Sequence, residues 1–524
     1  MIVSALISYF MVPGIFFQQD EILGFGLFIK EGSGIILSGL NSKVVMHFVP
    51  VTMSLSYALY SLFGPNYVIY NCVSLLFHFI NAALVYLIAK RILHSKFAQV
   101  ISAAIFVSSN SAAELLMWPV INLNVISLTF SLLSLLLILD GRVILATFLF
   151  LLSILSVEYG AGFVLLIPLT YIFLGRRSPK ENIKKLWPFA LAVFGYFLLR
   201  FIPLVGAEGF SSNTTSGGLP IYLRWLDLVP RYFGQLFFGQ SFTLWLSGLL
   251  SNLYPVKVNE VFIETKIYPG LSFVLGTAVI LLSYLFYIKK VRLQGSHYSR
   301  MFVLVVLSIA FGALPFLLIP GEAGSFSIFA SRYMYFGLFG LAIYIGILTD
   351  LLIRESKGVF RFGVLILVAA MIFSGTVRNF QKGEYLYSLG KMRLGIIKFI
   401  DESILNIPQK LVIYTGSTQS YYGLPGEEKI MPFQSGFGQT LLVFLNKPAD
   451  FPPEFFPGSY LWEIKSQGYM EFEGRGFGYF RDLDLLKKVV KDNSLPKDSV
   501  YAFSWEGTTG EIVNISDRIQ HEIR

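Results

Sequence analysis

The chain has 524 residues, of which 55% are hydrophobic and 14% charged, with a mean hydropathy of +0.65 and a formal net charge of +9. This composition lies outside the range of soluble globular proteins and predicts an integral membrane protein. The basic excess does not indicate a nucleic-acid partner, because the Lys and Arg residues lie in short loops between apolar runs, where they orient a membrane protein. Cys72 is the only cysteine, which excludes an intramolecular disulfide and a Cys-based metal cluster.

Apolar runs of roughly 17–25 residues recur along the first 375 residues, and each is long enough to cross a ~30 Å hydrocarbon core as a helix. The ten-residue alternation of a membrane barrel is absent from the pattern, so helices are predicted. The first run, "MIVSALISYFMVPGIFF", follows no basic leader and precedes no small-residue cleavage site, which predicts a span rather than a cleaved signal peptide. About eleven spans are predicted, at 1–17, 66–89, 97–117, 122–139, 143–157, 160–174, 187–205, 270–288, 301–319, 334–353 and 359–376.

The loops between spans predict the orientation of the chain. By simple alternation five connections share one side, and they hold most of the loop Lys and Arg, so that side is predicted to be cytoplasmic. These connections are 90–96, 140–142, 175–185, 289–300 and 354–361. The opposite side then faces the periplasm, cell exterior or lumen, and a multi-pass protein of the plasma membrane is expected. Segments 44–63 and 221–251 are predicted to be helices in or on the outer interface.

After about residue 377 the sequence becomes mixed and polar, which predicts a small soluble α/β domain over 377–524, on the outer side, after a transmembrane domain over 1–376. "KLVIYTG" (410–416) and "TLLVFL" (440–445) are interpreted as β-rich runs and "DLDLLKKVVKDN" (482–493) as a helix. "GRGFGYF" (474–480) is interpreted as a turn, since no helix follows it as a dinucleotide loop requires.

Acidic residues stand at the outer ends of several spans. Asp20 and Glu21 directly follow the first run. An isolated acidic pair usually marks a solvated membrane boundary, but a carboxylate at the mouth of a bundle can serve as a general base, because reduced hydration raises its pKa. Glu158 lies in the tight hairpin "SVEYG" and is expected to face a polar cavity, since an ionised acid near the membrane core costs about 2.5–3.5 kcal/mol. Glu114 fits a cavity or the water interface equally well.

Two further segments carry polar candidates. His47, in "MHFVP", is by itself more often a structural hydrogen-bonding residue, but it opens a composite run that continues into a span carrying His78 and Asn81. Arg332 and Tyr333 begin a span in "FASRYMYF". They fit a snorkelling cation with an aromatic belt, or a guanidinium that makes paired hydrogen bonds to a phosphate. Arg224 and Arg231 are weaker candidates for the same task.

Taken in order, these motifs resemble those of polytopic glycosyltransferases of the GT-C fold, most closely the protein O-mannosyltransferase-like branch, glycosyltransferase family 39. The resemblance covers roughly residues 10–340 and leaves out the C-terminal domain. It departs from the branch at Val157 and Ser331, where relatives often carry a Lys and an acid, and at Asn122 and Asn124, near which some carry an Arg. The matching motifs are "QQDEILGFG", "HFVPVTMSLSYALYSLFG", "LLFHFINAALVYLIAKRIL", "AAELLMWP", "LSVEYG" and "SRYMYF".

The resemblance implies a transferase that moves a sugar with inversion from a polyprenyl-phosphate donor to a protein, lipid or glycan acceptor at the outer face. Asp20 then looks like the catalytic base and Glu21 like a positioning neighbour. Arg332, and with it His47, would stabilise the phosphate leaving group. Asp20, Glu21, Glu114 and Glu158 could converge on a hard divalent cation, but the branch usually works without one, so no cofactor and no essential metal are expected.

Two other functions fit the sequence. A transporter or flippase for lipid-linked sugars would also use intramembrane acids and an Arg. Inverted repeats in the sequence would favour this function, but no clear repeat is found. A glycan polymerase or ligase would fit the long outer loops equally well, and only substrate assays separate it from a monosaccharide transferase.

Overall fold

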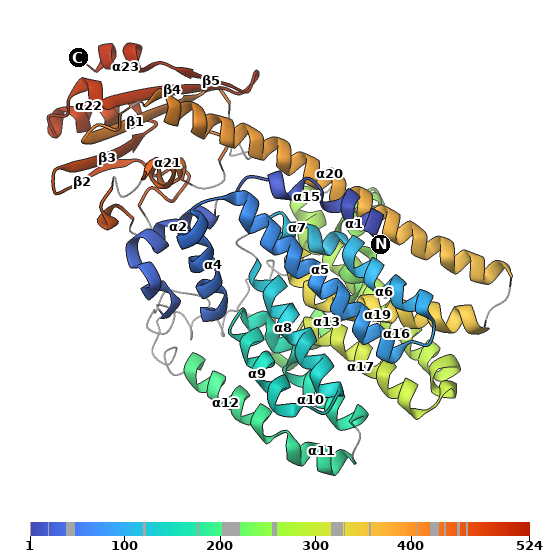
Figure 1. Ribbon diagram of the computed structural model, residues 1–524. Coiled ribbons are helices and arrows are strands. Elements are labelled where there is room, and N and C mark those ends of the chain that lie inside the picture. The colour runs from blue at the N-terminus through green and yellow to red at the C-terminus, as the bar shows by residue number, and fades with distance from the viewer. Residues whose placement is uncertain are drawn as a thin grey trace. The chain divides into compact units, whose positions relative to one another are not determined.

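The computed structural model describes residues 2–18, 20–37, 48–118, 122–175, 178–201, 221–253, 259–315, 329, 331–355, 358–404, 406–419, 429–433, 436–447, 451–456 and 460–523. It shows a helical membrane protein with a small C-terminal sheet (Figure 1). The chain divides into two compact units. The helical unit comprises Met1–Phe10, Ile36–Ser54 and Cys72–Gly383, and the mixed unit comprises Met11–Ile35, Leu55–Asn71 and Glu384–Arg524.

The helical unit consists of helices and their connections. Three of these helices, α4, α5 and α20, lie partly in the helical unit and partly in the mixed unit. Their bounds are α1 (Ile2–Tyr9), α4 (Pro50–Phe63), α5 (Tyr67–Ile92), α6 (Lys96–Ser108), α7 (Ala113–Leu116), α8 (Asn122–Leu139), α9 (Val143–Ile154), α10 (Phe163–Leu174), α11 (Pro179–Lys185), α12 (Trp187–Phe201), α13 (Ile221–Phe238), α14 (Gln240–Ser251), α15 (Glu260–Phe262), α16 (Tyr268–Phe286), α17 (Ser296–Gly312), α19 (Ser331–Glu355) and α20 (Val359–Ser403).

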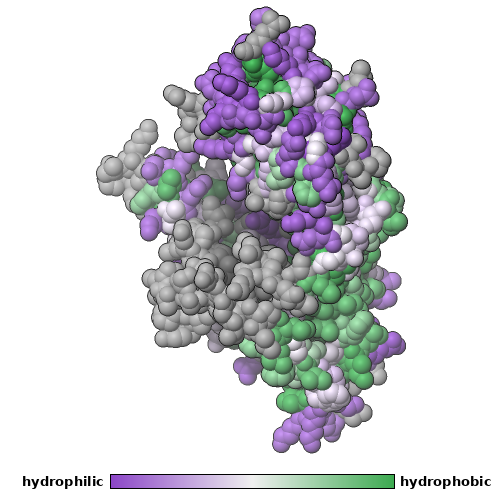
Figure 2. Space-filling model, turned by 90° about the vertical axis from the view of Figure 1, so that its left-hand side faces the viewer, coloured by the Kyte–Doolittle hydropathy of each residue, from purple (hydrophilic) through white to green (hydrophobic). Residues whose placement is uncertain are grey.

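Four helical stretches within the described ranges are long and apolar enough to cross a membrane, and seven apolar helices are shorter. The four are Tyr67–Ile92, Glu260–Gln294, Arg332–Arg354 and Arg361–Ser403. The predicted total of about eleven spans therefore stays a prediction. Only 17% of the apolar window of Glu260–Gln294 is buried inside the protein, as expected of a helix that faces lipid. Figure 2 shows apolar surface over the helices and polar surface over the C-terminal sheet.

The N-terminal segment differs from the predicted span at 1–17. α1 ends at Tyr9, a 3-10 turn covers Val12–Gly14, and residues 15–18 form neither helix nor strand before α2 begins at Asp20. Pro13 explains the break, because proline lacks the backbone N–H that an α-helix needs at an interior position. Ile2–Gly14 is thus one of the shorter apolar helices, and its predicted role as the first span stays a prediction.

α20 is longer than the span predicted at 359–376. It runs for 45 residues, and its bounds, Val359–Ser403, include the predicted domain border at 376/377. The division between the two units falls at Gly383–Glu384, also within α20. The apolar run predicted its start correctly, but a helix continues through polar sequence whenever one face stays packed, and composition alone does not detect that.

Glycines allow α13 to pack closely against α16. A Cβ added to Gly276 would overlap the carbonyl oxygen of Pro230, and one added to Gly234 would overlap that of Ser272. Small residues at a crossing let membrane helices approach each other in this way. The opposite neighbour of α13 is α19, since the Tyr232 hydroxyl accepts from the Gly337 amide at 3.2 Å. One face of α13 is therefore packed in the bundle, and its predicted position in the outer interface stays a prediction.

The mixed unit contains a five-stranded sheet of order β2-β3-β1-β4-β5. The central strand β1 (Lys410–Ser417) runs parallel to β3 (Arg475–Phe480) and β4 (Val500–Glu506), while the edge strands β2 (Gly468–Phe472) and β5 (Glu511–Asn514) are antiparallel. α22 (Leu483–Asp492) and α23 (Ser516–Glu522) pack on one face around a buried apolar core. The predicted strand at 410–416 and helix at 482–493 are confirmed.

One predicted strand is wrong. "TLLVFL" (440–445) belongs to α21 (Phe437–Leu445), which covers the other face of the sheet, where Gly438 contacts the ring of Tyr479. A short apolar run fits a buried helix as well as a buried strand, so its periodicity could not decide between them.

The turn predicted over 474–480 is shorter in the structure. Glu473 and Gly474, both with positive φ, form a two-residue hairpin loop, and β3 follows from Arg475.

The N-terminal part of the mixed unit packs against α21. α2 (Asp20–Glu31) lies on α21, where a Cβ on Gly26 would reach the Gln439 amide at 3.4 Å. Phe16 packs its ring 5.6 Å from that of Phe444. On another side of α2, Phe25 stacks on Tyr60 of α4 at 5.4 Å. Residues from both ends of the chain thus share one apolar core.

Candidate functional site

Arg332 lies at the start of α19 in a cluster of aromatic side chains in the helical unit. Its guanidinium carbon is 4.9 Å from the centre of the Tyr333 ring and 5.6 Å from that of Trp118. The Tyr333 ring meets Tyr159 edge-to-face at 5.3 Å, and the Tyr333 carbonyl accepts from the Tyr232 hydroxyl at 3.1 Å. We call Arg332, Tyr333, Trp118 and Tyr159 the arginine cluster.

The arginine cluster has donors suited to an anionic ligand. Aromatic faces attract a guanidinium by cation–π interaction and hold it in one orientation. Arg332 is half-buried, and its Nη2 donates to the Tyr333 hydroxyl at 3.4 Å. The planar guanidinium has a geometry that matches phosphate oxygens. The Trp118 indole N–H is buried and has no hydrogen-bond partner in the described part of the chain, and a buried donor left unpaired is costly unless a ligand or water completes it.

The backbone places two predicted acids near this cluster. Glu158 directly precedes Tyr159 in the 3-10 turn Glu158–Gly162, and Glu114 lies in α7, four residues before Trp118. Their side chains lie outside the described residues, so their proposed roles stay predictions. His47 lies wholly outside them. The weaker candidate Arg231 is ion-paired with Asp227 at 2.8 Å.

Buried polar groups next to the arginine cluster, further along α19, hold this helix in place. Tyr335, one helical turn after Arg332, is fully buried, and its hydroxyl lies 2.8 Å from His78 Nδ1 and 3.2 Å from Asn81 Nδ2 of α5. Asn81 also donates to the Val125 carbonyl of α8 at 2.9 Å. The composite run that the sequence indicated thus contributes two residues that fix the helix carrying Arg332.

Asp20 and Glu21 lie in the mixed unit, in the first turn of α2. Asp20 is half-buried and Glu21 is buried. Carboxylates in the first turn are stabilised by the exposed N–H groups and dipole of the helix, which is a structural reason for the pair.

Arg393, which no sequence pattern singled out, is fully buried in the mixed unit. Its Nε donates to the Pro432 carbonyl at 2.8 Å and its Nη1 to Gln18 Oε1 at 3.4 Å. Because Gln18 belongs to the segment that leads into α2, Arg393 fixes the approach to Asp20. Its partners are distant in sequence, so no local motif could have indicated them.

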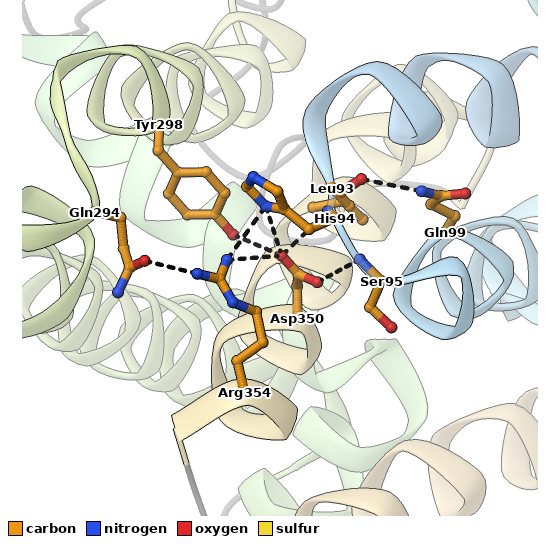
Figure 3. Close-up of polar contacts among 8 residues, drawn as sticks. All are labelled: Leu93, His94, Ser95, Gln99, Gln294, Tyr298, Asp350 and Arg354. Carbon is orange, nitrogen blue, oxygen red and sulfur yellow. Dashed lines mark hydrogen bonds and ion pairs between the residues drawn. The ribbon is translucent and has the colours of Figure 1, made fainter.

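A second polar cluster lies at the other end of α19 and includes Asp350, which is fully buried (Figure 3). Its carboxylate accepts from the backbone amides of Ser95 at 2.8 Å and His94 at 3.3 Å, just before α6 begins. Tyr298 Oη lies 3.5 Å away and Arg354 Nη1 3.8 Å away. Because Ser95 is the N-cap residue of α6, the carboxylate takes the place of the acid in a capping box, which accepts from the N-cap backbone amide.

Polar contacts also join the loops that were predicted to share one side of the membrane. Arg91 pairs with Asp140 at 2.7 Å, Arg300 donates to the Phe173 carbonyl at 2.7 Å, and Arg354 donates to Gln294 at 3.1 Å. These contacts bring the loops together at one end of the helical unit. The assignment of that end to the cytoplasm stays a prediction.

Comparison with protein-family models, curated proteins and solved structures finds no match.

Proposed function

We propose that the chain is a GT-C-like membrane glycosyltransferase that moves a sugar from a polyprenyl-phosphate donor to an acceptor on the extracytoplasmic side. The arginine cluster carries the proposal. A guanidinium held between aromatic rings beside an unpaired indole N–H suits a sugar phosphate, because the ring faces can stack on a sugar while the donors bind the phosphate.

The roles follow from the chemistry of the transfer. The acceptor oxygen attacks the anomeric carbon while the Asp20 carboxylate takes its proton. The bond between the anomeric carbon and the phosphate oxygen breaks on the opposite face, which inverts the configuration. Polyprenyl phosphate leaves with the electron pair, and Arg332 stabilises the charge that develops on it. Glu21 positions Asp20 or the acceptor, and neither role requires a metal.

The test uses the purified full-length protein with a polyprenyl-phosphate sugar, and follows the release of polyprenyl phosphate. Asp20→Asn should abolish release while the protein elutes as a folded species. Arg332→Gln should lower kcat by about 100-fold or more, the usual loss when one donor to a developing oxyanion is removed. Arg231→Gln removes the same charge from a residue that pairs with Asp227, and should leave kcat nearly unchanged.

Four results would contradict the proposal. Undiminished turnover in Asp20→Asn would exclude Asp20 as the base, and equal losses in Arg332→Gln and Arg231→Gln would exclude a specific phosphate contact. Transbilayer movement of an intact lipid-linked sugar, without release of polyprenyl phosphate, would identify a flippase instead. Transfer of whole glycan chains would identify a polymerase or ligase.

A further inference from the structure

An open groove lies at the end of the helical unit where the basic loops meet. It runs between the turn that joins α8 to α9 and the junction of α11 with α12, and its volume is about 830 Å³. One part of its lining is basic and the other is apolar. The basic residues are Arg142, Lys184 and Lys185, and the apolar wall includes Ile144, Phe148 and Trp187.

The groove is held open by fixed contacts. Asn182 of α11 is fully buried and donates to the Tyr171 carbonyl at 3.0 Å, which anchors α11 at the end of α10. Phe150 of α9 stacks on Phe189 of α12 at 4.6 Å. Because both walls are tied to the bundle, the lysines at the end of α11 and Arg142 line the same opening.

The cations of the groove are available to a ligand. Arg142, Lys184 and Lys185 are exposed, and none of them takes part in an ion pair within the described ranges of the chain. Asp140, next to the groove in sequence, is already paired with Arg91. Glu181 is the acid on α11, so this helix still carries a net positive charge.

The apolar wall consists of large side chains that are exposed. The exposed fractions are 75% for Ile144, 54% for Phe148 and 66% for Trp187. In a membrane protein such a surface is covered by acyl chains, and a Trp at its polar end is typical of the headgroup level. An occupant must therefore combine an anion with a hydrocarbon chain.

We propose that this groove binds an acidic phospholipid of the adjacent leaflet. The phosphate of the headgroup lies between Arg142 and the two lysines, and the acyl chains run along Ile144, Phe148 and Trp187. Basic pockets between membrane helices bind anionic headgroups by this combination of charge and apolar contact. The site is independent of the proposed sugar transfer, since it uses none of the residues of that reaction.

Fluorescence quenching tests the proposal on the full-length protein in phosphatidylcholine vesicles. Brominated phosphatidylglycerol is added in increasing mole fraction, and the part of the quenching that Trp187→Phe abolishes reports occupancy of the groove. Each Lys or Arg near a headgroup changes lipid affinity about 5-fold, so Lys184→Gln with Lys185→Gln should raise the half-saturating mole fraction about 25-fold. Lys180→Gln with Lys289→Gln changes the net charge equally outside the groove, and should shift it less than 2-fold.

Each other outcome overturns the proposal. Equal quenching by brominated phosphatidylcholine would show that the groove does not select an anionic headgroup. Full displacement of the lipid by excess inorganic phosphate would show a site for free anions. Equal shifts in the two double variants would show that only the overall charge attracts the lipid.

Discussion

Replacement of Asp350 by Ala should destabilise the helical unit more than any exposed substitution. The carboxylate is fully buried and accepts two backbone amides at the start of α6. Without it those amides lose their acceptor, at about 1–3 kcal/mol for each group that stays buried and unpaired. The nearby Arg354 also loses its counter-charge, although it is partly exposed. A total of about 3–5 kcal/mol is expected, the usual penalty for breaking a buried pair.

The assay is the thermal midpoint of the purified protein in detergent, followed by fluorescence-detected size exclusion. A loss of this size should lower the midpoint by about 5–10 °C. Asp350→Asn keeps one acceptor oxygen and should fall between the wild type and Asp350→Ala. The matched control is Asp140→Ala, because Asp140 is also paired with an arginine but is 40% exposed, and exposed pairs contribute about 0–1 kcal/mol.

Equal midpoints for Asp350→Ala and Asp140→Ala would refute this reasoning. They would mean that water or a rearranged loop replaces the carboxylate at little cost. A destabilisation by Asp350→Asn as large as that by Asp350→Ala would instead show that the negative charge, and not the capping acceptor, is what α6 requires.

Two further predictions concern packing and pH. Gly276→Ala should greatly reduce the yield of folded protein in size exclusion, because the new methyl group would overlap the Pro230 carbonyl, whereas Gly248→Ala, which meets nothing within 4 Å, should not. The hydrogen bond from Lys410 holds the pKa of Glu471 below its usual value of 4.5. Since the folded-state pKa is the lower one, the stability that Glu471 contributes is present above pH 4.5 and is lost as the pH falls through the folded-state pKa. As the pH falls through this range, the hydrogen-exchange rates of β2 and β3 should rise after correction for intrinsic rates. If Glu471→Gln showed the same pH dependence as the wild type, the titrating group would not be Glu471.

Sequence patterns predicted the parts of the fold that depend on local composition. The span predicted at 122–139 matches α8, and that at 66–89 matches most of α5, because long apolar runs permit few other structures in a membrane. The N-terminal span was overestimated, since Pro13 ends the regular helix within an apolar run. In the C-terminal domain, the run at 440–445 fits two kinds of buried element, and only its partners in space decide between them.

The candidate site was predictable to a similar degree. Arg332 and Tyr333 stood out because they begin an apolar span in one of the ordered motifs, and because a guanidinium there can bind a phosphate as well as snorkel to the interface. Trp118 and Tyr159 were close to predicted acids in the sequence, but the contact of Trp118 with Arg332 and that of Tyr159 with Tyr333 depend on how separate segments pack against α19. Asp350 was missed because its hydrogen-bond donor, the amide of Ser95, lies 255 residues away in the sequence. No local spacing indicates such a contact.

The mixed unit combines segments from both ends of the chain, which has a consequence for its synthesis. α2 must find α21, and Gln18 must find Arg393, which is 375 residues further along. At a translation rate of about 5–20 residues per second, the N-terminal segment waits about 20–75 s before its partner has been made. A chain that stops before α21 therefore cannot complete the core around α2, and in the proposed enzyme the segment that carries Asp20 would be among the last to reach its final structure.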